Sequence, residues 1–98
     1  MNVQLSDEAE RDLLDGIAFY DDSSRQAGDL FFDSLTADLR ALSFLGGVHA
    51  IRHGYHCASA SRFPFAIYYT VVSGIVLVVA ILDERRDPEW VANRLTNG

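Results

Sequence analysis

The chain has 98 residues, 49% of them hydrophobic, and a formal net charge of −6 at pH 7. This length fits one domain over residues 1–98 with a core of modest stability. The single cysteine, Cys57, excludes an internal disulfide, and the acidic charge argues against broad nucleic-acid binding. Because the N-terminus has no basic region followed by an apolar stretch, we expect no signal peptide and a cytoplasmic location.

The charge is distributed unevenly along the chain. Residues 1–38 carry ten acidic residues and two arginines, whereas residues 39–98 carry six arginines and four acidic residues. The chain has no lysine, and arginine binds a carboxylate or phosphate bidentately better than lysine does. The second half can therefore still form a local basic patch.

The N-terminal half predicts a short strand followed by two helices. Residues 2–5 alternate in polarity, and Ser6 is a favourable N-cap for a first helix that is interrupted at residues 21–24. Residues 25–45 predict a second helix. Each helix carries one apolar stripe: Ala9, Leu13, Ile17 and Tyr20 in the first, and Phe31, Leu35, Leu39 and Leu42, widened by Phe32 and Phe44, in the second. Two such helices form an antiparallel hairpin that a sheet must cover.

The C-terminal half predicts the sheet. Residues 48–60 indicate a weak strand pair around Gly54, and an uncharged run of twenty residues, 63–82, follows it. Ser73-Gly74 breaks this run, and nine of its residues are Ile, Val or Thr, so it is typical of a β-hairpin and not of a membrane helix. Its second arm does not alternate, so we expect both faces of that arm to be covered, within the chain or by a bound partner. Pro88 then begins a short final helix.

One group of basic residues flanks this predicted hairpin. Arg62 precedes the first arm, and Arg85 and Arg86 follow the second arm. A hairpin brings its open ends together, so the three guanidinium groups would lie near one edge and could bind a phosphate or carboxylate. The same arginines could instead form surface salt bridges with the neighbouring acidic residues.

A second basic group contains His49, Arg52, His53 and His56. In a strand, a spacing of three places His53 and His56 on opposite faces, and no carboxylate lies near them in the sequence to complete a zinc site. We therefore expect no metal ion and no cofactor, while a histidine acting as acid or base stays open. Trp90 is either an interface residue or the anchor of the final helix on the sheet.

Four segments in this order resemble the ParE branch of the RelE/ParE toxin superfamily, which is associated with plasmid stabilisation. They are LSDEAERDLLDGIAFY, then AGDLFFDSL, then RFPFAIYYTV, and then the apolar strand ending in ERRDP with Trp90 after it. The resemblance covers nearly the whole chain. It implies an α+β fold, in which an N-terminal helical hairpin packs on a small twisted antiparallel sheet with a short C-terminal helix. It also implies a bacterial toxin that a cognate antitoxin holds inactive.

Two departures from the superfamily bear on activity. Asp83 stands where many relatives carry histidine, and the chain is acidic overall, with no lysine and with neither tyrosine nor histidine after Trp90. The ribosome-dependent nucleases of the superfamily are strongly basic and use a Lys/Arg set with such a C-terminal residue. A general base and a phosphate clamp for RNA cleavage are therefore not evident here, and we expect no catalytic residues.

The resemblance favours the toxin of a type II toxin–antitoxin system, which inhibits DNA gyrase by binding it and does not bind DNA alone or a membrane. The antitoxin would be encoded directly upstream. The alternatives are a ribosome-dependent mRNA endoribonuclease of the RelE type and a non-toxic member that only binds its antitoxin. We expect partner contacts from Arg52, His53, His56, Arg62, Arg85, Arg86 and Trp90, and an antitoxin-facing apolar surface from Ile75, Leu77, Val79 and Ile81.

Overall fold

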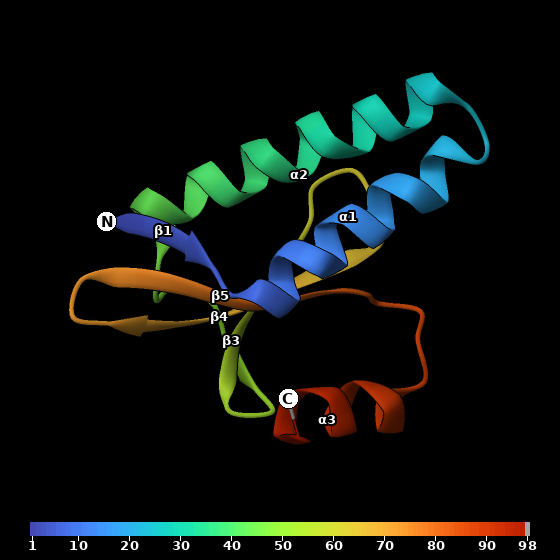
Figure 1. Ribbon diagram of the computed structural model, residues 1–98. Helices are drawn as coiled ribbons and strands as arrows, with labels where there is room; N and C mark the ends of the chain where they lie inside the picture. The colour runs from blue at the N-terminus through green and yellow to red at the C-terminus, as the bar shows by residue number, and fades with distance from the viewer. Residues whose placement is uncertain (98) are drawn as a thin grey trace.

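A five-stranded sheet separates a helical hairpin from one short helix in the computed structural model, which describes residues 1–97 (Figure 1). The strand order across the sheet is β1-β5-β4-β3-β2. The fold class is α+β, as predicted. Along the chain the elements are β1 Asn2–Leu5, α1 Asp7–Asp21, α2 Arg25–Leu45, β2 Ile51–Arg52, β3 Tyr55–Ser59, β4 Phe65–Val72, β5 Ile75–Asp83 and α3 Pro88–Asn97.

The sheet is mixed because β1, the first strand in the chain, runs parallel to β5, the last strand in the chain. The pairs β2–β3, β3–β4 and β4–β5 are antiparallel, which is the part of the implied antiparallel sheet that the structure has. β1 instead pairs parallel with β5, from Asn2 opposite Ile75 to Leu5 opposite Val78. A parallel pair needs a long connection, and here α1, α2 and the three other strands lie between the two partners in the chain.

Two-residue turns close both predicted hairpins. Ser73 and Gly74 have φ angles of 51° and 77° between β4 and β5, and His53 and Gly54 have φ angles of 54° and 84° between β2 and β3. Positive φ at both central positions is the backbone geometry that matches the right-handed twist of paired strands. The predicted breaks at Ser73-Gly74 and at Gly54 are therefore confirmed.

Side-chain caps fix where the helices begin. The Ser6 hydroxyl accepts a hydrogen bond of 3.1 Å from the backbone N–H of Ala9 at the start of α1. The Asp87 carboxylate accepts one of 3.1 Å from the N–H of Glu89 at the start of α3. Both caps satisfy N–H groups that a helix leaves without an internal partner. The predicted starts at Ser6 and Pro88 are confirmed.

Apolar side chains pack on both faces of the sheet. The face under α1 and α2 buries the predicted helix stripes against the strands, while α3 is the one helix among the described residues on the opposite face (Figure 1). Within residues 1–97 no helix is long and apolar enough to cross a membrane. The buried residues of the first cluster are Ala9, Phe31, Leu35, Leu39, Leu42, Ala58, Phe65, Ile67, Tyr69, Val76, Val78 and Ile81, and those of the second are Ala66, Tyr68, Ala80, Leu82, Val91 and Leu95.

Phe32 and Phe44 do not join the buried stripe of α2. Their side chains are 46% and 89% exposed, so the predicted widening of the stripe was wrong. Successive helix residues are rotated by about 100°, and Phe31 already points into the core, so Phe32 turns towards solvent. Phe44 lies in the last turn of α2, two residues beyond the buried Leu42.

A β-bulge in β5 changes which side chains face the helices. Tyr69 lies opposite Val78 and Tyr68 lies opposite Ala80, so Val79 is an extra residue without a partner of its own. The extra residue shifts the alternation, since Val76 and Val78 face the helical hairpin, as does Ile81. Both faces of the C-terminal half of β5 are therefore covered within the chain, as predicted from its lack of alternation.

Gly16 in α1 leaves room for the Phe31 ring of α2. A Cβ atom at Gly16 would lie 2.5 Å from Cζ and 2.6 Å from Cε2 of Phe31, whose side chain is fully buried. Overpacking typically costs about 1–3 kcal/mol, which exceeds the gain of about 1 kcal/mol in helix propensity. We therefore expect Gly16→Ala to lower the free energy of unfolding, as measured by urea denaturation. A more stable variant would show that the ring can relax.

Candidate functional site

Arg52, His53 and Arg86 line one pocket on the α3 side of the sheet. The pocket lies between the β2–β3 hairpin and the start of α3 and has a volume of about 310 Å³. Arg52 and Arg86 are 34 residues apart in the chain, so the fold brings together members of both predicted basic groups. We call this cavity the arginine pocket. Its other lining residues are Ala50, Cys57, Ser59, Ala66, Tyr68, Glu84, Pro88 and Val91.

Local structure positions each of the three basic side chains. Arg52 is the last residue of β2, and His53 occupies the first position of the tight turn that follows. The Arg86 guanidinium carbon lies 4.0 Å from the centre of the Trp90 ring, in cation–π contact. Trp90 is on the first turn of α3 and is 37% exposed. Trp90 therefore supports Arg86 at the mouth of the pocket and still presents surface of its own.

The guanidinium groups of Arg52 and Arg86 are available for an external anion. Neither forms an ion pair with a carboxylate in the part of the chain that the structure describes. Arg85, by contrast, donates two hydrogen bonds to Asp83, of 3.0 and 2.7 Å. That pairing also holds the pKa of Asp83 below its usual value. The arrangement favours binding of a carboxylate or phosphate at Arg52 and Arg86, and not at Arg85.

Burial keeps the thiol of Cys57, which lines the arginine pocket, in the protonated form. Cys57 of β3 lies opposite Tyr68 of β4, and burial raises the pKa of the Cys57 thiol above its usual value. The hydrogen bond from Tyr68 and the charge of Arg52 act in the opposite direction but do not cancel the effect of burial. A raised thiol pKa means little thiolate at neutral pH, so Cys57 is a poor nucleophile.

Burial also raises the pKa of Tyr68 to about 12, and the adjacent Cys57 adds to the rise. In the unfolded chain tyrosine loses its proton near its usual pKa of 10.0, so deprotonation favours unfolding. We expect this contribution to stability to be complete below about pH 10 and to be lost as the pH rises towards about 12. Denaturation of the wild-type chain and of Tyr68→Phe across this range tests it. Equal pH dependence of the two proteins would contradict it.

His56 lies on the opposite face of the sheet from the arginine pocket. Its ring stacks on that of the buried Tyr69, with ring centroids 5.0 Å apart, and its Nδ1 donates a hydrogen bond of 2.6 Å to the carbonyl oxygen of His49. The Tyr69 hydroxyl accepts from the N–H of Gly47 at 3.0 Å and lies 2.6 Å from Nδ1 of His49. These contacts hold His56 against the buried cluster between the sheet and the helical hairpin, so its role is structural.

The three arginines that flank the β4–β5 hairpin do not line a common pocket. Arg62 lies in the loop before β4, beside Asp33 and Ser34 of α2. Arg85 is paired with Asp83, and only Arg86 reaches the arginine pocket. The hairpin does bring its ends together, since Phe65 lies opposite Asp83. The three arginine side chains point in different directions because they lie in loops beyond the last residue pair of β4 and β5. There the side chains no longer alternate between the two faces of the sheet.

The predicted apolar surface of β5 is shorter than expected. Ile75, Leu77 and Val79 are partly exposed along the strand, whereas Ile81 is 2% exposed and packs in the cluster under the helical hairpin. The bulge at Val79 accounts for the difference, because it turns Ile81 to the other face of the sheet. Ile81 therefore has no surface to offer a partner.

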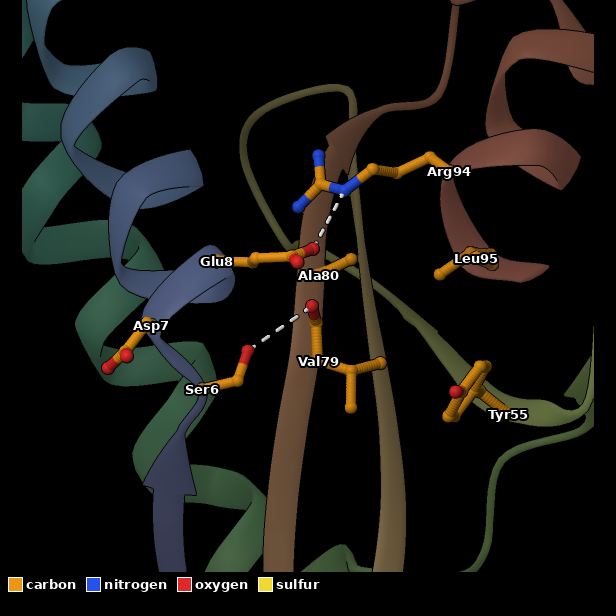
Figure 2. Close-up of a pocket in the computed structure, with 8 residues that line it drawn as sticks. All are labelled: Ser6, Asp7, Glu8, Tyr55, Val79, Ala80, Arg94 and Leu95. Carbon is orange, nitrogen blue, oxygen red and sulfur yellow. Dashed lines mark hydrogen bonds and ion pairs between the residues drawn. The ribbon is translucent and has the colours of Figure 1, made fainter. Parts of the chain in front are cut away.

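A groove crosses β5 at Val79 and Ala80, next to this partly exposed surface (Figure 2). Tyr55, Val79 and Leu95 give it an apolar side, and Ser6 and Glu8 at the start of α1 give it a polar side. Arg94 of α3 reaches across to Glu8 with an Nε–Oε2 distance of 3.4 Å. The Ser6 hydroxyl donates a hydrogen bond of 3.4 Å to the carbonyl oxygen of Val79, the bulge residue. The groove is suited to an apolar side chain flanked by polar groups.

Sequence reasoning did not predict that Tyr68 and Glu84 line the arginine pocket or that Tyr55 lines the groove of Figure 2. The β3–β4 register places Cys57 beside Tyr68, which the sequence could have indicated only if the pairing of the two strands had been known. Metal ligation has no support within residues 1–97, where no three His, Cys, Asp or Glu side chains come close enough to hold an ion.

Comparisons with known proteins identify a fold likeness. No family model matches the sequence, and a search of curated proteins finds no match. Among solved structures, the chain is similar to one from the "Chromosomal ParDE TA system from P. aeruginosa", with a TM-score of 0.73 and 16% sequence identity. The match covers 83% of this chain and 92% of that chain. The architecture is therefore one that a solved ParDE system contains.

Proposed function

We propose that this chain is the toxin of a type II toxin–antitoxin system, that it acts in the cytoplasm by binding and inhibiting DNA gyrase, and that a cognate antitoxin neutralises it. The observation that carries the proposal is the likeness of nearly the whole fold to a chain from a ParDE system, which agrees with the order of the sequence segments quoted above. That likeness supports a toxin–antitoxin component. The gyrase target rests on the resemblance to the ParE branch.

The surfaces of the molecule fit action by binding proteins. Ile75, Leu77 and Val79 offer partly exposed apolar area on the face that α3 covers only in part, and the groove of Figure 2 continues it. The arginine pocket adds the guanidinium groups of Arg52 and Arg86, which form no ion pair with a carboxylate within residues 1–97, next to the partly exposed Trp90. Aromatic and arginine side chains are enriched at the energetic centres of protein interfaces. We place antitoxin contacts on the β5 surface and target contacts around Trp90.

A ribosome-dependent endoribonuclease is the second candidate, and the arginine pocket is the observation that favours it. Arg52 and Arg86 could stabilise a phosphorane, and His53 could transfer a proton. Tyr68 is poorly suited as a base, because its pKa of about 12 keeps it neutral. The net charge of −6 would also oppose entry into ribosomal RNA, whereas a protein target tolerates it. We therefore rank gyrase binding above RNA cleavage.

Induced expression of the chain in bacteria tests the toxin assignment. We expect growth arrest when the chain is expressed alone, and normal growth when the product of the adjacent upstream reading frame is expressed with it. A destabilised control is Phe31→Ala, which should arrest growth less because the loss of a buried ring lowers the amount of folded protein in the cell. Normal growth under induction of soluble, folded protein would contradict toxicity. If the neighbouring product still bound the chain, a non-toxic antitoxin-binding member would be the better description.

A further inference from the structure

We propose that two copies of this chain associate through an apolar surface at the C-terminal end of α2. Met1, Phe44, Leu45 and Val48 form this surface, which we call the α2-end surface, and their side chains are 48%, 89%, 46% and 70% exposed. Phe44 is the most exposed large apolar side chain among the described residues. The dimer is independent of the gyrase target and of the antitoxin, since it needs only the chain itself.

Local structure brings the α2-end surface together from two distant parts of the sequence. The chain turns after α2, where the Val48 N–H donates a hydrogen bond of 3.1 Å to the carbonyl oxygen of Leu45. Figure 1 shows the start of β1 beside this end of α2. The Met1 nitrogen donates a hydrogen bond of 2.8 Å to the carbonyl oxygen of Ser43, and a Cβ atom at Gly46 would lie 2.6 Å from Cε of Met1. Met1 therefore packs against the last turn of α2.

The size of the α2-end surface indicates a weak dimer. An aromatic side chain covers about 150–250 Å² when it is buried, so Phe44 alone presents on the order of 150 Å². With its three neighbours the surface reaches the few hundred Å² at which exposed apolar patches mark interaction sites. Two such surfaces stay below the roughly 1,200 Å² of stable complexes. We therefore expect a dissociation constant in roughly the micromolar range.

The charge of the α2-end surface identifies a second copy as its occupant. In a twofold-symmetric dimer each surface meets itself, so any charged side chain at its centre meets a like charge. Residues 41–48 contain no charged side chain, although the chain has a net charge of −6. Arg40, one turn before Phe44, is the nearest charged residue on α2 and lies at the rim. The Met1 ammonium is bound to the carbonyl end of α2, which favours a positive charge.

The acidic residues of the helical hairpin lie far enough away to permit this contact. Asp21, Asp22 and Asp29 surround the turn between α1 and α2, at the opposite end of the hairpin (Figure 1). Fifteen residues separate Asp29 from Phe44, or about 22 Å along the helix axis. That distance exceeds twice the Debye length of about 8 Å at physiological ionic strength. Salt therefore screens most of the repulsion between the acidic ends of two copies.

The other exposed apolar side chains of the two helices are less suited to self-association. Leu14, Leu30 and Phe32 are 63%, 46% and 46% exposed, and each is next to an aspartate in the sequence. Pairing two copies through any of them would bring these carboxylates together, which is unfavourable. The end of α2 is where a helix of this chain exposes a large aromatic side chain without an adjacent carboxylate.

Sedimentation velocity of the purified chain tests the dimer, at concentrations from about 1 to about 200 μM that span the expected dissociation constant. We expect a shift from monomer to dimer as the concentration rises. Phe44→Glu should raise the dissociation constant at least about tenfold, because it places two carboxylates at the centre of the contact. Phe32→Glu is the matched control, since it changes the same residue type on the same helix, and it should leave the dissociation constant unchanged.

Two further measurements identify the nature of the contact. The urea denaturation of Phe44→Glu should match that of the wild-type chain below the dissociation constant, because the side chain is 89% exposed in the monomer. Raising the salt concentration to about 1 M should not dissociate the dimer, since the contact is apolar. A monomer at every concentration, equal effects of Phe44→Glu and Phe32→Glu, or a dimer that salt dissociates would overturn the proposal. A monomer whose binding to the antitoxin is lost in Phe44→Glu would assign the α2-end surface to the antitoxin and overturn it as well.

Discussion

Replacing Phe31 with alanine is expected to lower the free energy of unfolding by about 3–5 kcal/mol, the range for removing a buried aromatic ring. Phe31 has no exposed surface, and its ring lies at centre-to-centre distances of 5.0 Å from Tyr20, 5.1 Å from Phe63 and 5.0 Å from Phe65. The ring thereby joins α1, α2 and the start of β4. A cavity there would remove contacts that hold the helical hairpin on the sheet.

Phe32→Ala is the matched control, because its side chain is 46% exposed and removal leaves no closed cavity. We expect that change to cost far less, within the range of about 0.5 kcal/mol that is usual for surface substitutions. Urea denaturation of the two variants measures the difference. Similar losses for Phe31→Ala and Phe32→Ala would mean that the aromatic cluster does not hold the core together.

Asp12→Ala is expected to lower the free energy of unfolding by about 2–4 kcal/mol. One carboxylate oxygen of Asp12 accepts the backbone N–H of Ile81 at 3.0 Å and an N–H of Arg94 at 2.7 Å. The Asp12 side chain is only 10% exposed, and its removal leaves the N–H of Ile81 and the guanidinium of Arg94 without this partner. The effect should be smaller than for a fully buried pair because Arg94 keeps some contact with solvent.

The same carboxylate fixes α3 in place, so the variant has a second readout. Val91 and Leu95 of α3 pack against the sheet. Arg94 of α3 forms ion pairs with Asp12 and Glu8 of α1. We expect faster hydrogen exchange of the α3 amides in Asp12→Ala. Asp15→Ala, at an exposed position one turn further along α1, should change neither quantity. Unchanged stability in Asp12→Ala would show that solvent replaces the lost bonds.

Much of the fold could be predicted because local chemistry and global packing agree. Ser6 and Pro88 mark helix starts that the backbone adopts, and Ser73-Gly74 supplies the positive φ angles that a two-residue turn requires. The apolar spacing from Phe31 to Leu42 identifies the buried face of α2. These signals act over a few residues, so a single sequence carries them.

The features that were missed depend on pairing between distant segments. The bulge at Val79 is set by the register with β4, and its shift of Ile81 to the helical side could not be derived from alternation. The Asp12–Arg94 bridge joins residues 82 apart in the chain. For the site, Arg52, His53 and Arg86 meet as members of the two predicted basic groups, whereas His56, Arg62 and Arg85 lie elsewhere. Strand pairing decides which of them share a face.

The most direct test of the central claim assays the purified chain in parallel on DNA gyrase supercoiling and on translating ribosomes. A gyrase-binding toxin predicts loss of supercoiling activity, which added antitoxin restores, and intact transcripts on the ribosomes. The Arg86→Ala variant should weaken gyrase inhibition without unfolding the chain, since Arg86 is exposed beside Trp90. Ribosome-dependent transcript cleavage that disappears in Arg86→Ala and His53→Ala, with supercoiling unaffected by the wild-type chain, would contradict the account.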